Sequence, residues 1–246
     1  MKHPDRIIVA AAVLLVVFSA ASLAQPPAEH TSQATSFRAA ADFQLTADPL
    51  SPAWKGVPGI SFQHGRYAEP IDGHLTELRS RWTEANLFLL FICDYENLQS
   101  KPGPPSKEET QELWNWDVAE VFIGSDFENV RRYKEFEVSP RGEWLDLAIE
   151  IDPGGKHIID SAWNSGFASM ARIDADAKVW YAEMRIPMSS IAPWKPAPGR
   201  TFRANFYRIQ GSPQRLLAWQ PVHQEWFHKP EVFGTLTLEG STPHLP

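Results

Sequence analysis

The pattern that most limits the fold is the strict alternation of apolar and polar residues in short segments. Residues 143–151 place four aliphatic side chains on one side, opposite Trp, Asp, Ala and Glu, which is the two-residue period of a β-strand. Residues 178–187 and 202–210 repeat this alternation, and 232–238 give a last strand. No helical period exceeds about two turns. The sequence therefore predicts an all-β fold, an antiparallel, jelly-roll-like β-sandwich with long irregular loops.

A β-hairpin is expected near the centre of the sheet. Residues 87–93 form a continuous apolar run, typical of a strand that is covered on both faces, and they follow the alternating segment 76–82. Cys93, the one cysteine of the chain, ends this run and is expected to be a small buried hydrophobe. An early strand is expected within residues 37–45. Residues 97–112 contain three prolines and a glycine among charged residues, so they are expected to form a long loop.

The N-terminus has the features of a targeting signal. Lys2 and Arg6 flank an apolar run, residues 7–18, and Ser22-Leu23-Ala24 has the small-x-small pattern of a signal-peptidase site. The run is shorter than the roughly 18 residues of a membrane-spanning helix. We therefore expect export, to the periplasm or the medium, with an uncleaved membrane anchor as the alternative. Three parts follow: a signal peptide (1–24), a disordered leader (25–36) and one domain (37–246).

Charge and motifs exclude several classes of function. The formal net charge is -7 and the lysines and arginines are dispersed, so neither nucleic acid nor, after signal cleavage, a membrane is an expected partner. No glycine-rich phosphate loop and no nucleophile elbow occurs. His223, Glu225 and His228 lie close together in the sequence, but their spacing is not that of a zinc site.

The strongest functional signal is a pair of tryptophans that each precede a strand. Trp114 follows the long proline-containing loop, and Trp226 occupies the matching place before the last strand. A sugar ring has an apolar C–H face and a rim of hydroxyl groups, so it needs a flat aromatic surface together with charged or amide groups. Tryptophan offers the largest such surface at a low conformational cost. The pair therefore predicts the two walls of a slot for a sugar.

Three groups of residues carry a family resemblance. They are Trp114-x-x-Asp117 leading into Glu120-Val121-Phe122-Ile123; Tyr133-x-Glu135-Phe136-Glu137-Val138-Ser139-Pro140 with Trp144 and Asp146; and, near the C-terminus, Arg203-x-Asn205-Phe206-Tyr207-Arg208, Ala218-Trp219 and Phe227-His228-x-Pro230-Glu231-Val232-Phe233-Gly234. Over roughly residues 75–238 the chain resembles carbohydrate-binding module family 9 and its stand-alone exported relatives. The resemblance implies a β-sandwich that holds a sugar end unit between two tryptophans and has no catalysis of its own.

The resemblance also assigns roles to individual residues. Trp114 and Trp226 correspond to the two clamping tryptophans of the family. Further polar contacts to the sugar are expected from Glu120, Glu137, Arg203, Asn205 and Tyr207, although residues 137–140 depart from the polar set of sugar-binding members. Family members hold structural calcium, for which Asp94 and Glu96 are plausible oxygen donors. The expected partner is a mono- or oligosaccharide, or the end of a polysaccharide, in polysaccharide use.

Two other functions remain as alternatives. The domain could have kept the sandwich and lost the sugar, which would leave a structural or interaction role. It could also be a glycoside hydrolase, since Glu135 and Glu137 would point to one face of a strand about 7 Å apart, within the range for paired catalytic carboxylates. Rows of acidic residues are common on solvated sheet faces, and the resemblance is to a non-catalytic module, so catalysis is not expected.

Overall fold

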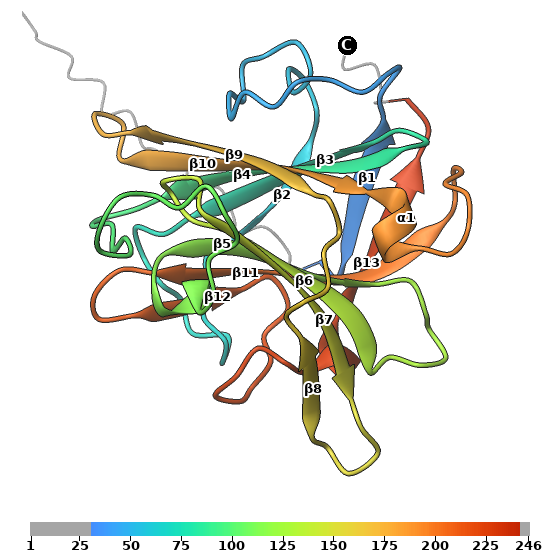
Figure 1. Ribbon diagram of the computed structural model, residues 1–246. Coiled ribbons are helices and arrows are strands. Elements are labelled where there is room, and N and C mark those ends of the chain that lie inside the picture. Colours follow the sequence, from blue (N-terminus) through green and yellow to red (C-terminus); the bar gives the residue numbers. More distant parts are fainter. Residues whose placement is uncertain (1–30, 242–246) are drawn as a thin grey trace, which may run out of the picture.

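The computed structural model describes residues 31–241, which form an almost entirely β-stranded domain (Figure 1). The strands are β1 (Gln33–Arg38), β2 (Gly59–Phe62), β3 (Thr76–Trp82), β4 (Asn86–Asp94), β5 (Val118–Gly124), β6 (Arg132–Val138), β7 (Trp144–Ile151), β8 (His157–Asp160), β9 (Ala168–Asp174), β10 (Val179–Pro187), β11 (Thr201–Gln210), β12 (Arg215–Ala218) and β13 (Gly234–Glu239). The short helices are η1 (Leu113–Asn115), α1 (Met188–Ile191) and η2 (Pro230–Val232). Within residues 31–241, no helix is long and apolar enough to cross a membrane.

The strands form one continuous sheet that curls into two facing layers. The order is β8-β7-β6-β5-β11-β13-β1-β3-β4-β10-β9, with β12 beside β11 and β2 beside β3. In Figure 1 the layer of β3, β4, β10 and β9 lies over the layer of β5, β6, β7 and β11, while β1 and β13 run along one side. This arrangement confirms the predicted β-sandwich and the predicted hairpin of β3 and β4.

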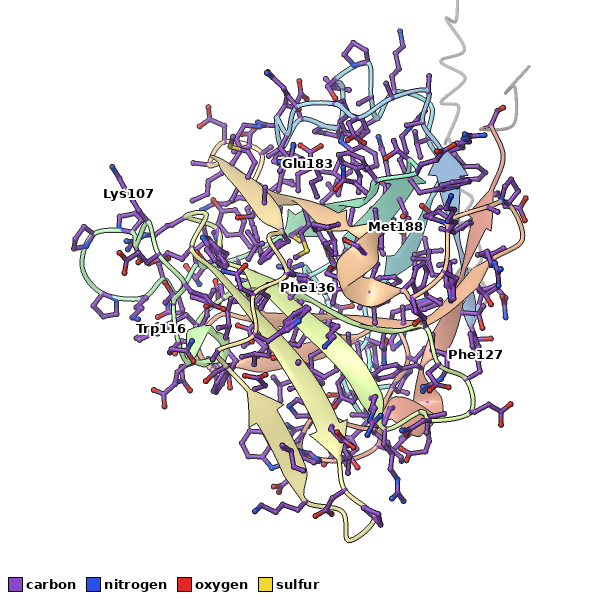
Figure 2. The ribbon with its side chains drawn as sticks, turned by 45° about the vertical axis from the view of Figure 1, so that its right-hand side comes forward. Lys107, Trp116, Phe127, Phe136, Glu183 and Met188 are labelled. Carbon is purple, nitrogen blue, oxygen red and sulfur yellow. The ribbon has the colours of Figure 1, made fainter. Side chains whose placement is uncertain are left out.

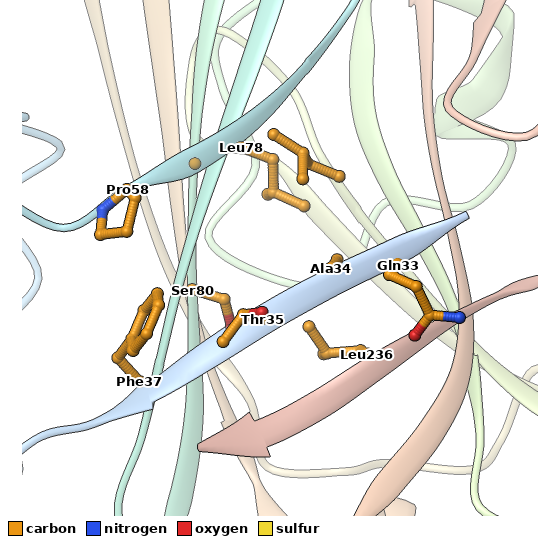
Figure 3. Close-up of a pocket in the computed structure, with 10 residues that line it drawn as sticks. Gln33, Ala34, Thr35, Phe37, Pro58, Leu78, Ser80 and Leu236 are labelled. Atoms are coloured by element: carbon orange, nitrogen blue, oxygen red, sulfur yellow. The ribbon is translucent and has the colours of Figure 1, made fainter. Parts of the chain in front are cut away.

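One strand departs from the antiparallel prediction. β1 pairs in parallel with β13 on one side and with β3 on the other, so the sheet is mixed. Figure 3 shows β1 beside β13, next to a cavity that Ala34, Leu78 and Leu236 help to line. β1 thus joins the two layers. Its two neighbours, β13 and β3, lie far apart in the sequence.

The same strand corrects the predicted domain boundaries. Residues 33–36 were assigned to a disordered leader but form most of β1, and the strand expected within 37–45 ends at Arg38. Ala34 and Ser36 are buried, and the Ser80 hydroxyl donates a hydrogen bond to Ser36 Oγ (2.8 Å). This polar segment is therefore ordered because it pairs with β13 on one edge and β3 on the other. Amino-acid composition does not reveal such pairing. The expected signal peptide and the rest of the leader fall outside the described residues, apart from 31 and 32.

Apolar side chains form three clusters, one between the layers and one on the outer face of each layer. The central cluster includes Phe136, which lies in the middle of the molecule in Figure 2. Outside β4 and β10, Phe88 and Leu90 pack under the loop that carries Trp54. Outside β5, β6, β7 and β11, a third cluster is covered by residues that include Phe227. Burial on both faces explains the continuous apolar run of β4, including Cys93, which is buried as predicted.

The long loop before β5 is irregular, as predicted, and one buried carboxylate fixes its end. Figure 2 shows Lys107 on the outer bend of this loop and Trp116 near its end. Asp117 accepts hydrogen bonds from the backbone N–H of Gln99 (2.7 Å) and Gly211 (2.6 Å), and from Gln210 Nε2 (2.8 Å). Asp117 thereby ties the loop and η1, which carries Trp114, to the turn after β11.

Candidate functional site

The two tryptophans line a single pocket of about 620 Å³ on the outer face of β5 and β6. Trp114 comes from η1 and is half-buried. Trp226 comes from the segment before η2, and 70% of its surface is exposed. Phe122 and Phe227 extend the aromatic lining of the pocket. The structure thus brings together the pair that the sequence selected, although their chain segments are far apart.

Hydrogen bonds to the backbone position both tryptophans. Gln214 Nε2 donates to the carbonyl oxygen of Trp114 (3.2 Å). Gln224 Nε2 donates to the carbonyl oxygen of Trp226 (2.9 Å), and Arg66 Nη1 donates to that of Glu225 (2.6 Å). Because these bonds hold the main chain, the indole rings themselves stay available to a ligand.

Three carboxylates lie together at the floor of the pocket. Glu120 on β5 and Glu135 on β6 line it, and Glu137 lies directly opposite Glu120 in the strand register. All three are buried, and one ligand oxygen from each can be chosen so that the three lie within 4.8 Å of one another. Oε2 of Glu120, Oε2 of Glu135 and both oxygens of Glu137 have no hydrogen-bond partner.

Burial shifts the protonation of these groups strongly. It raises the pKa of Glu120 and Glu137 well above the usual range, and the neighbouring carboxylates raise both further. Burial also raises the pKa of Glu135, to about 7. The strand alternation that buries Val118 and Phe122 places Glu120 on the same face. Titratable side chains in an apolar layer break the ordinary pattern of a core, which is typical of functional sites.

An imidazole pair completes the wall of the pocket. The Tyr133 hydroxyl, whose pKa is raised by burial, forms a hydrogen bond with His228 Nδ1 (2.7 Å). The His228 ring also stacks on Phe122 (5.0 Å between centroids) and lies 5.0 Å from the ring of His157. Burial, together with the charge of His157, lowers the pKa of His228 to about 4. His228 is therefore neutral at physiological pH.

The lowered pKa of His228 makes the stability of the protein depend on pH. The pKa of His228 is about 4 in the folded state and about 6.5 when unfolded, so as pH falls the unfolded chain takes up its proton first. The contribution of His228 is complete above about pH 6.5 and is lost as pH falls towards 4. We expect wild type to lose on the order of 2 kcal/mol more than His228→Gln between pH 7 and 4. Urea denaturation of both proteins across this range checks it, and parallel stability curves would contradict it.

Four of the five predicted polar contacts do not line the pocket: Glu137, which is fully buried opposite Glu120, and the three residues Arg203, Asn205 and Tyr207. Asn205 Nδ2 donates to Tyr207 Oη (2.7 Å) and to the carbonyl oxygen of Gln220 (2.8 Å), and both Asn205 and Tyr207 are fully buried. Tyr207 donates to the carbonyl oxygen of Phe227 (3.1 Å) and stacks on its ring. Arg203 donates to the carbonyl oxygens of Val130 and Pro230. These three residues position the segment that carries Trp226 instead of facing the pocket.

Several lining residues were not selected from the sequence as ligand contacts. Arg66, His157 and His228 line the pocket. Glu135 had been considered only as a catalytic acid, yet it lines the pocket beside Glu120. β8, which carries His157, is short and exposed, so it has no alternation to reveal it. Asp94 and Glu96 do not join the one cluster of three metal-ligand side chains found within residues 31–241, which is Glu120, Glu135 and Glu137.

The fold and this pocket define a β-sandwich ligand-binding domain with aromatic walls and an acidic floor. Residues 51–241 match the model of the family described as "Carbohydrate family 9 binding domain-like". The chain therefore belongs to this family.

Known proteins agree with that assignment. The chain is 26% identical over 181 residues to the UPF0462 protein C4orf33 homolog of Danio rerio, which covers 69% of this chain and 84% of the relative. A Bacteroides uniformis structure proposed to bind carbohydrate superposes with a TM-score of 0.64 at 16% identity, over 84% of this chain and 99% of the other. A family 9 carbohydrate-binding module of Caldicellulosiruptor kristjanssonii in complex with glucose gives 0.57 at 14% identity, over 86% and 98%. A family 9 module of the same organism in complex with cellotriose also gives 0.57, at 15% identity, over 87% of this chain and 98% of the other. The family match supports a carbohydrate-binding role, and the structural neighbours share the fold.

Proposed function

We propose that the protein is an exported, non-catalytic carbohydrate-binding domain that holds one sugar unit between Trp114 and Trp226. The observation that carries this proposal is the meeting of these two tryptophans in one pocket above buried carboxylates. Its partners are mono- or oligosaccharides, or polysaccharide ends, and its role lies in polysaccharide use. Export is supported by the N-terminal sequence pattern, and the mass of the mature protein, with Gln25 first, tests it.

The chemistry of the pocket suits a sugar. Indole rings pack on the apolar C–H face of a pyranose, and they lose little conformational freedom in doing so. The carboxyl groups of Glu120 and Glu135 face the same space and can form hydrogen bonds with hydroxyl groups. Glucose and cellotriose, the ligands of the Caldicellulosiruptor modules, are the first sugars to test.

The test is calorimetric titration of wild type with glucose, cellotriose and a wider panel of saccharides. We expect saturable binding that weakens at least about tenfold in Trp114→Ala and in Trp226→Ala, since stacking on an aromatic ring and the exclusion of water are lost. Trp194→Ala serves as the matched control, because Trp194 is half-buried but packs on Phe202 away from the pocket. The proposal would be contradicted if wild type bound none of the sugars, or if both pocket variants bound sugar with the affinity of wild type.

The same purified proteins also distinguish sugar binding from the two alternative functions, a structural role and glycoside hydrolysis. A domain with only a structural role would bind none of the saccharides while remaining folded. A hydrolase would release reducing ends from polysaccharides, and we expect none. Glu135 and Glu137 are buried together on one strand, whereas paired catalytic carboxylates flank the scissile bond across an open cleft.

A further inference from the structure

The carboxylates at the floor of the pocket lack the partners that buried charges require. Glu137 is 0% exposed, and neither of its oxygens has a hydrogen-bond partner. Among residues 31–241, no lysine or arginine comes within 4.0 Å of Glu120, Glu135 or Glu137. Buried polar groups in folded proteins are almost always satisfied, and leaving a charged one unpaired is costly. The missing partner of this cluster must therefore come from outside the chain, as protons or as a cation.

The spacing of the oxygens fits a cation. One oxygen from each carboxylate lies within 4.8 Å of the others. Calcium binds oxygen at about 2.3–2.6 Å, so two of its ligand oxygens lie at most about 5 Å apart, and the observed limit falls within that range. The three carboxylates can therefore surround one calcium ion with little movement. All the donors are hard oxygen ligands, which is the class that calcium prefers.

The position of the cluster gives the cation a role. Glu120 and Glu135 also line the pocket that both tryptophans line, so an ion held there has protein oxygens on one side and the pocket on the other. Three carboxylate groups leave part of the coordination shell of calcium, which takes six to eight oxygens, to be filled from the pocket. Vicinal sugar hydroxyls are oxygen donors of the right kind.

We propose that Glu120, Glu135 and Glu137 bind a calcium ion at the floor of the pocket, and that sugar hydroxyls complete its coordination. The second half of this statement rests on the proposed sugar-binding function. The ion offsets the mutual repulsion of the three carboxylates. It also gives the pocket a means to select sugars by the geometry of adjacent hydroxyl groups.

The first experiment uses the metal alone. Protein treated with EDTA and then freed of it is titrated with CaCl₂, MgCl₂ or MnCl₂ by calorimetry, and its Tm is followed in parallel. We expect saturable calcium binding, a rise in Tm, and at least about a tenfold loss of calcium affinity in Glu137→Gln. Glutamine keeps the shape and removes a buried charge, so this variant should fold, which circular dichroism verifies. Glu150→Gln on β7, which removes an exposed strand carboxylate, should bind calcium like wild type.

The second experiment titrates saccharide into wild type in calcium and in EDTA. We expect at least about tenfold weaker sugar binding in EDTA. If sugar binds and calcium does not, the three carboxylates share protons only and the calcium site is overturned while the proposed function stands. If calcium binds and no sugar does, the proposed function fails alone. Calcium binding with equal sugar affinity in both buffers overturns the coordination of hydroxyls by the ion.

Discussion

Replacing Glu183 by alanine is expected to lower the free energy of unfolding by about 3–5 kcal/mol. Glu183 is fully buried on β10, and in Figure 2 it lies beneath the loop that covers the outer face of this layer. Its Oε2 accepts hydrogen bonds from the backbone N–H of Thr46 and Ala47 (both 2.6 Å). Its Oε1 accepts one from Trp54 Nε1 (2.7 Å).

The size of this effect follows from what the alanine would leave behind. Three N–H groups would lose an ionised acceptor, and those of Ala47 and Trp54 are completely buried. Ala47 also has a positive φ of 50°, a conformation that a non-glycine residue keeps only when its surroundings hold it. Trp54 covers the outer cluster with Phe88. Loss of the carboxylate would therefore release the loop together with part of its apolar contact.

Chemical denaturation of wild type, Glu183→Ala and Glu183→Gln measures the change in the free energy of unfolding. Glutamine keeps one acceptor oxygen, so it should have an intermediate effect. Glu69→Ala is the control, because Glu69 is exposed and accepts a single backbone hydrogen bond, from Tyr67, and should cost less than about 1 kcal/mol. A loss below about 1 kcal/mol for Glu183→Ala would show that the loop is held by other contacts.

Glu183 also shows what the sequence could and could not predict about the fold. The alternation of residues 178–187 located β10 and its faces, because a period of two is a local property. The side that carries Glu183 was expected to be a polar face. It is in fact covered by a loop from far earlier in the chain. β1 was missed for the same reason, since its two parallel neighbours are set by tertiary structure. The short β8 and the partly exposed β9 (Ala168–Asp174) lack alternation strong enough to stand out.

The pocket was predictable to a similar extent. Trp114 and Trp226 were found because each precedes a strand. Those strands, β5 and β13, lie on either side of β11 and are both antiparallel to it, so they run in the same direction. Asn205 and Tyr207 share one face of β11 and were expected to contact the sugar, but the segment that carries Phe227 covers that face. The acidic floor depends on register, because Glu120 meets Glu137 only through the pairing of β5 with β6.

Replacing Asp117 by alanine is expected to weaken sugar binding at least about tenfold and to cost about 3 kcal/mol of stability. Asp117 is 1% exposed, and its carboxylate accepts two backbone N–H bonds and one from Gln210 Nε2. Its own N–H donates to the carbonyl oxygen of Gln99 (2.9 Å). These bonds fix both ends of the long loop close to Trp114, so their loss should let the indole leave its place in the pocket while Trp226 stays.

Calorimetric titration at a temperature where the variant is folded separates the two effects, because binding is then compared between folded proteins. Asp126→Ala is the control: Asp126 also accepts two backbone N–H bonds, from Glu128 and Asn129 (both 2.9 Å), but it is exposed and lies in the turn after β5. The Asp126→Ala substitution should leave sugar affinity unchanged. If Asp117→Ala lost stability but bound sugar like wild type, Trp114 would be placed by η1 itself. Loss of both stability and sugar affinity in Asp117→Ala, but not in Asp126→Ala, would show that the long loop positions Trp114, because Asp117 itself does not line the pocket.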